Sequence, residues 1–173
     1  AAIETANVPA RLRKIGVDQV WDRMSRYGQN VTVANVDSGV EYTHFLLNGQ
    51  YRGTWTGSHD YNWFDATGTY PAAPGDDHGH GTATMGLMVG DDGERHIGVA
   101  PRARWIAAKV FDNAGFAFDS WIHDGFQWIL APDGDPALAP DVVNNSWGSI
   151  LSVNKEFLPD VQALRAAGIL PIF

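Results

Sequence analysis

The sequence predicts an α/β fold built around a mainly parallel sheet. Short apolar, β-branched runs alternate along the 173 residues with longer stretches in which apolar side chains recur at helical spacing. This alternation is typical of β-α-β units, in which right-handed helical crossovers join parallel strands. With 45% hydrophobic and 18% charged residues, the chain has the composition of one folded domain with a substantial core.

The first half of the chain contains a predicted helix, a strand, a long excursion and a second helix. Apolar residues lie at helical spacing over residues 17–24, and a β-branched run over 31–36 ends at Asp-Ser-Gly, residues 37–39. This run predicts a buried strand that leads into a turn. Residues 53–75 are aromatic, polar and rich in Gly and Pro, so we expect at most one short strand there. Residues 82–89 are small and apolar, and we predict a buried helix.

The second half of the chain continues the alternation of strands and helices. Residues 105–111 and 141–145 are apolar runs that predict two further core strands. Residues 119–130 predict an amphipathic helix, because Asp or Ser can cap its start and large apolar side chains share one face. Residues 157–167 predict another amphipathic helix, and residues 169–173 begin a fourth core strand.

Charge and composition narrow the classes of function. The net charge of −8 disfavours nucleic acid and anionic membranes as partners, and no apolar run approaches the ~20 residues that span a bilayer. The absence of cysteine excludes disulfides, cysteine-ligated metals and a cysteine nucleophile. The chain starts with Ala-Ala-Ile-Glu-Thr, which we interpret as the trimmed start of a mature protein. We therefore expect a secreted, extracellular protein.

Two glycine-containing motifs place a carboxylate and a histidine where parallel sheets build sites. Asp37 follows the first predicted strand, and His80 lies in His-Gly-His-Gly-Thr, residues 78–82, ahead of a predicted helix. Sites in such sheets form beyond the carboxyl ends of the strands. An aspartate that accepts a hydrogen bond from one imidazole nitrogen leaves the other nitrogen free to take a proton from a serine. The pair therefore predicts two thirds of a nucleophilic triad.

These motifs resemble those of the subtilisin-like serine proteases, or subtilases. The similar segments are Val-Asp-Ser-Gly-Val at 36–40, His-Gly-Thr at 80–82, Ile-Gly-Val-Ala-Pro at 97–101 and Val-Asn-Asn-Ser-Trp-Gly at 143–148. The run from 128 to 148 especially resembles bacillopeptidase F-like members. The resemblance extends from about Ile15 to Phe173. It implies a three-layer α/β/α fold, with residues 1–173 as the N-terminal portion of a single peptidase domain.

The resemblance also implies roles for particular residues. Asp37 and His80 become catalytic residues of a serine endopeptidase that uses an Asp-His-Ser triad. A substrate peptide would lie as an added strand between two extended edges, at residues 115–117 and 146–148. From the strand and helix positions we further predict a hydrophobic substrate subsite lined by Phe111, Ile122 and Trp147. The alternative interpretation is that these side chains only pack in the core. Together the predicted substrate-binding residues are Phe111, Gly115, Phe116, Ala117, Ile122, Ser146, Trp147 and Gly148.

Some positions depart from the family pattern. Ala83 stands where many subtilases have a further histidine, and His78 competes with His80 as the catalytic histidine. Leu46 stands where a calcium-ligating aspartate is common, and it cannot ligate calcium. The acidic segments 91–94 and 133–135 read as solvated turns, with calcium ligation as their alternative. No metal-binding residue is therefore assigned, and calcium is left open as a structural ion of the complete enzyme.

A nucleophile is not evident in the sequence. Subtilases carry an Ala-Gly-Asn segment that supplies the oxyanion-hole side chain and a Gly-Thr-Ser segment that supplies the serine, and neither occurs in the 173 residues. Ser146 is the nearest substitute, but its match is to the substrate-binding strand. We therefore expect two partners, a peptide or protein substrate and the missing C-terminal part of the same enzyme. By itself the chain is predicted to be inactive.

Two other functions are left open by these motifs. A non-catalytic, peptide-binding pseudo-protease would keep the groove, but it would need neither Asp37 nor His80. A metal-dependent hydrolase could use His-x-His and adjacent aspartates, namely His78, His80, Asp76 and Asp77. The glycines on either side of His80 would hold such a metal site loosely.

Overall fold

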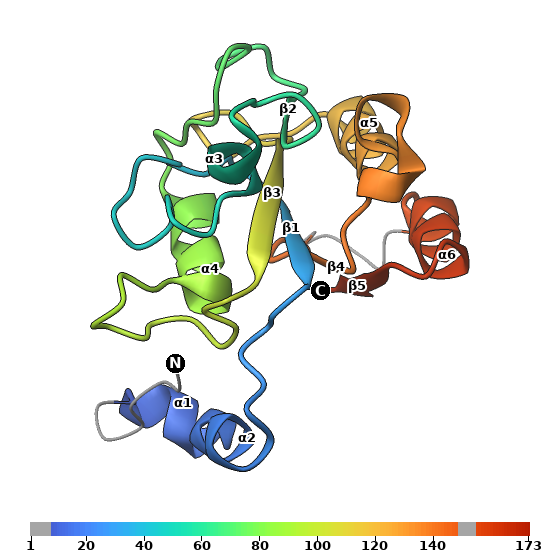
Figure 1. Cartoon of the computed structure of the whole chain (residues 1–173). Coiled ribbons are helices and arrows are strands. Elements are labelled where there is room, and N and C mark those ends of the chain that lie inside the picture. Colours follow the sequence, from blue (N-terminus) through green and yellow to red (C-terminus); the bar gives the residue numbers. More distant parts are fainter. Residues whose placement is uncertain (1–7, 149–154) are drawn as a thin grey trace.

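The computed structural model describes residues 8–148 and 155–173 and contains a parallel five-stranded sheet (Figure 1). The strand order is β2-β3-β1-β4-β5, which places β1 in the centre, and every neighbouring pair is parallel. The strands are β1 (Thr32–Asp37), β2 (Trp63–Asp65), β3 (Arg104–Lys109), β4 (Val142–Asn144) and β5 (Leu170–Ile172).

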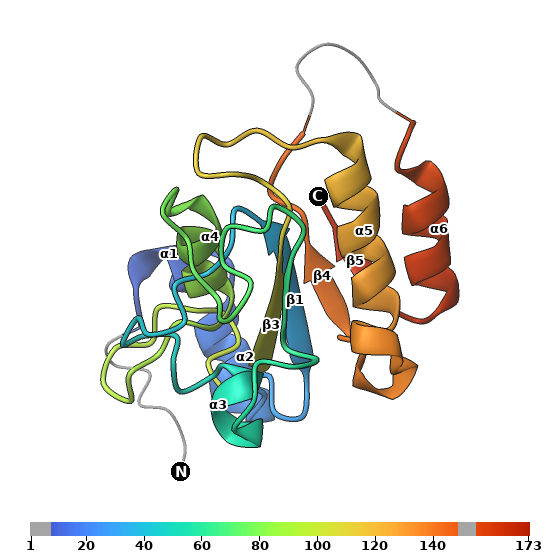
Figure 2. The ribbon, with the colours of Figure 1, turned by 90° about the horizontal axis from the view of Figure 1, so that it is seen from above.

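Helices cover both faces of the sheet, as the view from above shows (Figure 2). On one side α3 (Arg52–Thr56) contacts β3 and α4 (His80–Val89) contacts β1. On the other side α5 (Asp119–Leu130) contacts β1 and β3, while α6 (Leu158–Ala166) contacts β5. Short 3₁₀ turns at Pro132–Gly134 and Pro136–Leu138 follow α5. The predicted three-layer α/β/α fold is confirmed.

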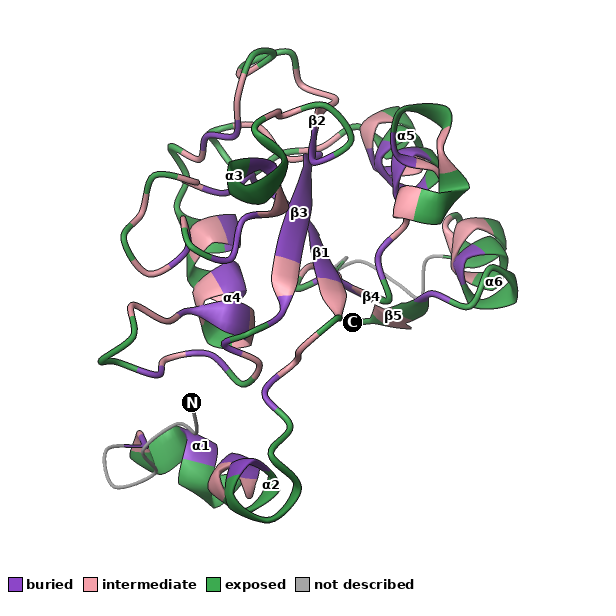
Figure 3. Ribbon diagram, in the orientation of Figure 1, coloured by how far each residue is buried: buried purple, intermediate pink, exposed green. Residues whose placement is uncertain are grey.

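The core has two halves because side chains alternate along each strand. Val33 faces the α4 side, where it joins Trp105 and Met85, whereas Ala34 and Val36 face the α5 side. Both faces of the central strands are therefore buried (Figure 3). Burial on both faces explains why these strands read as continuous apolar runs in the sequence.

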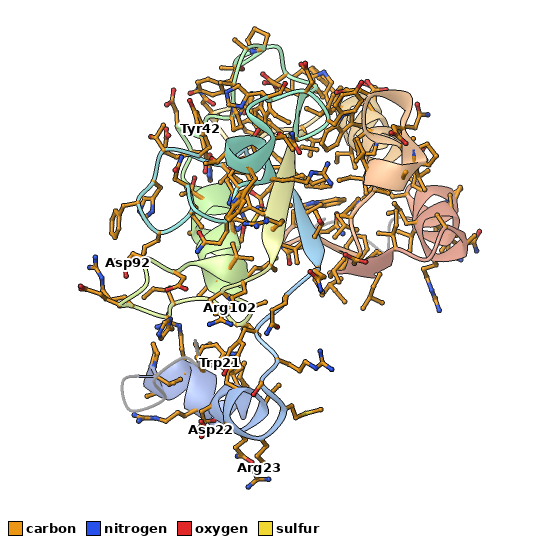
Figure 4. All side chains as sticks on the ribbon, in the orientation of Figure 1. Trp21, Asp22, Arg23, Tyr42, Asp92 and Arg102 are labelled. Carbon is orange, nitrogen blue, oxygen red and sulfur yellow. The ribbon has the colours of Figure 1, made fainter. Side chains whose placement is uncertain are left out.

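A helix pair lies at the amino end of the sheet and has its own small core. It comprises α1 (Ala10–Lys14) and α2 (Val17–Met24). Trp21 is buried in this small core and donates its indole N–H to the carbonyl of Val99 at 3.2 Å. The guanidinium of Arg102 lies 4.6 Å from the ring centre of Tyr27 and adds a cation–π contact (Figure 4 labels Trp21 and Arg102).

Two boundaries differ by two residues from those predicted, and the burial of one helix also differs. β3 ends at Lys109 because the amides of Val110 and Phe111 turn to the carbonyl of Asp37, at 2.9 and 3.3 Å. α4 begins at His80, not at residue 82, and only one of its faces is buried. The prediction of a buried helix was therefore wrong for the outer face, where Leu87 is 52% exposed. No helix within the described residues is long and apolar enough to cross a membrane.

Candidate active site

Asp37 and His80 are in contact at the carboxyl edge of the sheet. Asp37 is the last residue of the central strand, and His80 is the first residue of α4. The Asp37 Oδ1 and His80 Nδ1 atoms are 2.7 Å apart, so the predicted hydrogen bond is present. The Asp37 side chain is only 3% exposed, whereas that of His80 is 44% exposed. A buried carboxylate thus orients an imidazole that reaches solvent.

Glycines allow the two motifs to approach this closely. Gly39 has a φ of 110°, and a Cβ on it would lie 2.1 Å from the carbonyl oxygen of Gly75. A Cβ on Gly81 would lie 2.0 Å from the carbonyl oxygen of Gly39. A larger residue at Gly81 would push the start of α4 away from the turn that follows β1, and one at Gly39 would push that turn away from the segment at Gly75. Gly81 therefore allows the start of α4 to approach the turn that follows Asp37.

Asp76 caps α4, although the sequence analysis did not assign it that role. Its Oδ1 accepts hydrogen bonds from Ser38 Oγ and from the amide of Gly79, both at 2.9 Å. Its Oδ2 accepts from the amide of Thr82 at 2.8 Å and from Thr82 Oγ1 at 2.6 Å. Because Ser38 Oγ also accepts from the amide of Gly81 at 3.0 Å, the turn after Asp37 is joined to the first turn of the helix.

A buried asparagine holds α4 against the sheet. Asn35 Nδ2 donates to the carbonyl of Gly81 at 3.0 Å and to Thr84 Oγ1 at 2.9 Å. Its Oδ1 accepts from Asn144 Nδ2 at 2.9 Å, and the same amide contacts Ser146 Oγ at 2.9 Å. The sequence signal that could have identified Asn35 is its polar side chain within the apolar run 31–36. The pairing itself depends on the strand order, which the sequence does not state.

Two of the three residues predicted to line a hydrophobic subsite, Phe111 and Trp147, are in contact. The rings of Phe111 and Trp147 are half-buried, with centres 5.8 Å apart, so these two side chains lie together. Ile122 is only 5% exposed and belongs to the core beneath them. Core packing, the alternative stated for this subsite, therefore describes Ile122 well. A contribution of Phe111 and Trp147 to substrate binding stays a prediction.

The two predicted substrate edges have different local structures. Gly115 has a φ of 82°, and the amide of Asp112 donates to the carbonyl of Phe116 at 2.8 Å, which closes a tight loop. Phe116 is 72% exposed at its tip, and Ala117 is half-buried. On the other edge the exposed residues are Ser146 and Gly148.

Ser146 and His78 have the following neighbours. Ser146 Oγ donates to Asn144 Oδ1 at 3.1 Å. The exposed His78 ring lies 6.2 Å from the His80 ring, edge to face, and it is His80 that is bonded to Asp37.

The described ranges, 8–148 and 155–173, contain no group of three or more histidine, aspartate or glutamate side chains arranged to hold a metal ion. The acidic segments instead bond to their own neighbourhoods. Asp91 contacts His96 Nδ1 at 3.1 Å, and Asp92 pairs with Arg95 at 2.6 Å. Asp133 Oδ1 accepts from Trp128 Nε1 at 3.0 Å. The metal-hydrolase alternative thus has no ligand cluster to support it in this part of the chain.

The fold and the Asp–His pair together define a class of protein. The model of the subtilase family matches residues 28–170. The chain belongs to the subtilase family, a family of serine proteases.

Individual relatives agree with this membership. The chain is similar to Bacillopeptidase F of Bacillus subtilis (strain 168), with 39% identity over 181 residues that cover 98% of this chain and 12% of that protein. It is also similar to Subtilisin-like protease 1 of Trichophyton equinum, with 35% identity over 135 residues that cover 74% of this chain and 23% of that protein. The chain thus spans less than a quarter of the length of these two relatives.

Solved structures show the same fold. The chain superposes with a TM-score of 0.70 on fervidolysin from Fervidobacterium pennivorans, described as a keratinolytic enzyme related to subtilisin, at 26% identity over 92% of this chain and 23% of that chain. A cold adapted subtilisin-like serine proteinase gives a TM-score of 0.66 at 22% identity, over 84% of this chain and 46% of that chain. The predicted subtilisin-like fold is confirmed.

Proposed function

We propose that this chain supplies the aspartate and the histidine of a serine endopeptidase that hydrolyses peptide bonds in peptides or proteins. The observation that carries the proposal is the 2.7 Å contact between Asp37 Oδ1 and His80 Nδ1, with the carboxylate buried and the imidazole half exposed. This asymmetry suits an orienting acid and a base that must meet an incoming group. Membership of the subtilase family supports the same assignment.

The chemistry follows from the two ring nitrogens of His80. Asp37 accepts the Nδ1 hydrogen and so fixes the tautomer in which Nε2 is unprotonated. Nε2 then accepts the proton of a serine hydroxyl as that oxygen attacks the peptide carbonyl carbon. Asp37 stabilises the resulting imidazolium, which passes its proton to the leaving amine. Water attacks the acyl-enzyme in a second round of the same proton transfers.

The serine and the oxyanion-hole donor belong, in this proposal, to the C-terminal part of the same enzyme. That part is the partner of this chain, and the complete enzyme acts outside the cell. The substrate backbone would pair with residues 115–117 and 146–148 on either side of the site. Phe111 and Trp147 would contact an apolar substrate side chain near the scissile bond.

The proposal is tested by hydrolysis of a fluorogenic peptide and by fluorophosphonate labelling of the complete enzyme. Asp37→Asn should lower kcat about 10⁴-fold, the effect of the equivalent change in another serine protease, because the imidazole takes the wrong tautomer. His80→Ala should abolish turnover and labelling. His78→Ala is the matched control and should retain activity.

Two results would contradict the proposal. Activity that survives His80→Ala but not His78→Ala would assign the base to the other histidine. Inhibitor-sensitive turnover by residues 1–173 alone would place a nucleophile within this chain, and Ser146→Ala would then identify it or eliminate it.

A further inference from the structure

Lys109 is a buried cation directly beside the aspartate of the candidate site. It is the last residue of β3, has no exposed surface, and pairs in register with Asp37 across the sheet. Its Nζ donates to the carbonyl of Ser38 at 2.6 Å, to the carbonyl of Phe111 at 2.8 Å and to Asn113 Oδ1 at 3.1 Å. The three protons of an ammonium group thus have three acceptors, so the group is held in one place.

The ammonium group of Lys109 is buried and has several carboxylates near it. Burial lowers the pKa of Lys109, and four nearby carboxylates act in the opposite direction. A buried ammonium group is costly unless hydrogen bonds and charges compensate it. The compensating carboxylates are Asp65, Asp76, Asp112 and Asp77.

The orientation of Asp37 depends on the residue that Lys109 holds. Within the described residues Asp37 Oδ1 accepts from the amide of Ser38 at 2.7 Å and contacts His80, whereas the buried Oδ2 has no hydrogen-bond partner. Among the residues that the structure describes, the main chain of Ser38 is therefore the one hydrogen-bonding support of the carboxylate besides the imidazole itself. The carbonyl of that same residue accepts the shortest of the three Lys109 hydrogen bonds. The stem of Lys109 also lies against the turn, because a Cβ on Gly39 would be 3.4 Å from Lys109 Cδ.

The other two hydrogen bonds of Lys109 reach the loop that leads to a predicted substrate edge. Phe111 and Asn113 lie just ahead of residues 115–117. Asn113 Nδ2 donates in turn to Asp77 Oδ2 at 3.1 Å, in the segment that precedes His80. One ammonium group thus connects the turn after β1 with the loop after β3, and through Asn113 with the approach to α4.

We propose that Lys109 is a positioning residue that keeps the Asp37–His80 pair and the 115–117 substrate edge in a fixed spatial relation. The proposal rests on the function proposed above and adds to it a residue outside the triad. Lys109 acts through Ser38 on the chemical step and through Asn113 on substrate binding. These two effects can be separated by mutation.

The experiment compares Lys109→Met with Asn113→Ala in the complete enzyme. Lys109→Met keeps the length of the side chain and removes all three hydrogen bonds, so kcat should fall about 100-fold, the typical effect of a misplacement of about 1 Å. Asn113→Ala changes an exposed residue and removes its bonds to Lys109 and to Asp77, while the bonds of Lys109 to the carbonyls of Ser38 and Phe111 remain. It should mainly raise KM. Near-UV circular dichroism establishes that each variant is folded.

A second measurement does not depend on turnover. The ¹⁵N chemical shifts of the His80 ring show which nitrogen carries the proton. The neutral wild-type ring should be the Nδ1–H tautomer, and Lys109→Met should give a mixture of tautomers. If the wild-type enzyme hydrolyses no peptide, the proposed function fails, and the tautomer comparison still decides the role of Lys109.

Folded Lys109→Met with wild-type kcat and an unchanged tautomer would overturn the proposal. So would an Asn113→Ala variant whose KM is unchanged, and this arm stands even if Lys109→Met does not fold.

Discussion

The indole N–H of Trp147 donates a hydrogen bond to the main-chain carbonyl of Val36, at 2.9 Å. Val36 immediately precedes Asp37, and Trp147 lies in the predicted substrate edge after β4. Pairing between β1 and β4 ends at Asn35 and Asn144, so the indole continues the connection after the strands part. A predicted substrate-contacting residue is thus tied to the strand that carries the aspartate.

Trp147→Phe should destabilise the fold while keeping much of the aromatic packing. The ring of Trp147 packs against Phe111 and Phe126, and a phenyl ring retains those contacts. It cannot donate to the carbonyl of Val36, and an unsatisfied buried carbonyl costs about 1–3 kcal/mol. Urea unfolding of the two proteins measures this difference. An unchanged midpoint would show that another donor replaces the indole.

Trp147→Ala should change the preference among peptide substrates. Removal of the indole enlarges the hydrophobic subsite predicted beside Phe111, so large apolar side chains should gain relative to small ones. Rates across a peptide library, measured with the complete enzyme, test this. Kinetics that fall by the same factor for every peptide would assign Trp147 to packing alone.

Two glycines of α4 should respond to alanine in opposite ways. In Gly81→Ala the new Cβ would lie 2.0 Å from the carbonyl oxygen of Gly39, so the helix must shift, at a cost of about 3 kcal/mol. Gly86 has nothing within 4 Å of its Cβ position, and Gly86→Ala should stabilise the helix by up to about 1 kcal/mol. Urea unfolding of both variants checks the pair. Equal effects at the two positions would contradict the close approach at Gly81.

Asp76→Ala should weaken the start of α4. It leaves the amides of Gly79 and Thr82 and the hydroxyl of Ser38 without their acceptor, which we expect to cost about 2 kcal/mol. Asp124→Ala, at an exposed carboxylate on α5, is the control for the loss of a charge. Unfolding midpoints measure the loss of stability, and the NMR signals of the His80 ring show whether the first residue of α4 has changed its surroundings. A loss no larger than that of the control would show that the cap is dispensable.

The contact between α5 and α6 should weaken as the pH rises. His123 Nδ1 lies 2.9 Å from Asp160 Oδ2, and its Nε2 lies 3.4 Å from Glu156 Oε1. Burial acts to lower the pKa of His123, but these two carboxylates outweigh it, and the pKa is raised above the ordinary 6.5. The stabilisation is therefore fully present below about pH 6.5 and is lost as the pH rises through the raised pKa.

Urea unfolding at about pH 5.5 and about pH 8.5 measures this dependence. His123→Gln should flatten the difference in stability between the two pH values, because glutamine has no proton to lose. If His123→Gln has the same pH dependence of stability as the wild type, a titratable group other than His123 causes that dependence.

The elements that the sequence predicted well are those with a strong local pattern. The runs that became β1 and β3 are apolar on both faces, so residues 31–36 and 105–111 could be placed to within two residues. The helices α1 and α3 were not predicted, because each has only five residues and depends on tertiary contacts. The exposed outer face of α4 was also not predicted. Its residues are small or apolar, and such a sequence does not show which face of a helix is packed against the protein.

The site was predictable where a motif carries the chemistry. Asp37 and His80 could be proposed as partners because both lie in glycine-flanked turns beside predicted elements. The support around them was not predictable in the same way. Asp76 and Asn35 act through hydrogen bonds to distant main-chain groups, and these depend on how the loops fold back. Burial of Lys109 depends on its place beside the central strand, and a lysine at the end of a strand otherwise suggests exposure.

The proposed site and the α1–α2 helix pair lie at opposite ends of the sheet, and this separation is useful for protein engineering. The loops after β1 and β3 leave at the end where Asp37 lies, whereas the α1–α2 pair meets the chain near Val99 and Arg102, where β3 begins. Substitutions in the small core around Trp21 can therefore be used to raise thermal stability without altering the loops proposed to govern cleavage preference. Conversely, those loops can be randomised in a library while the opposite end keeps the scaffold intact.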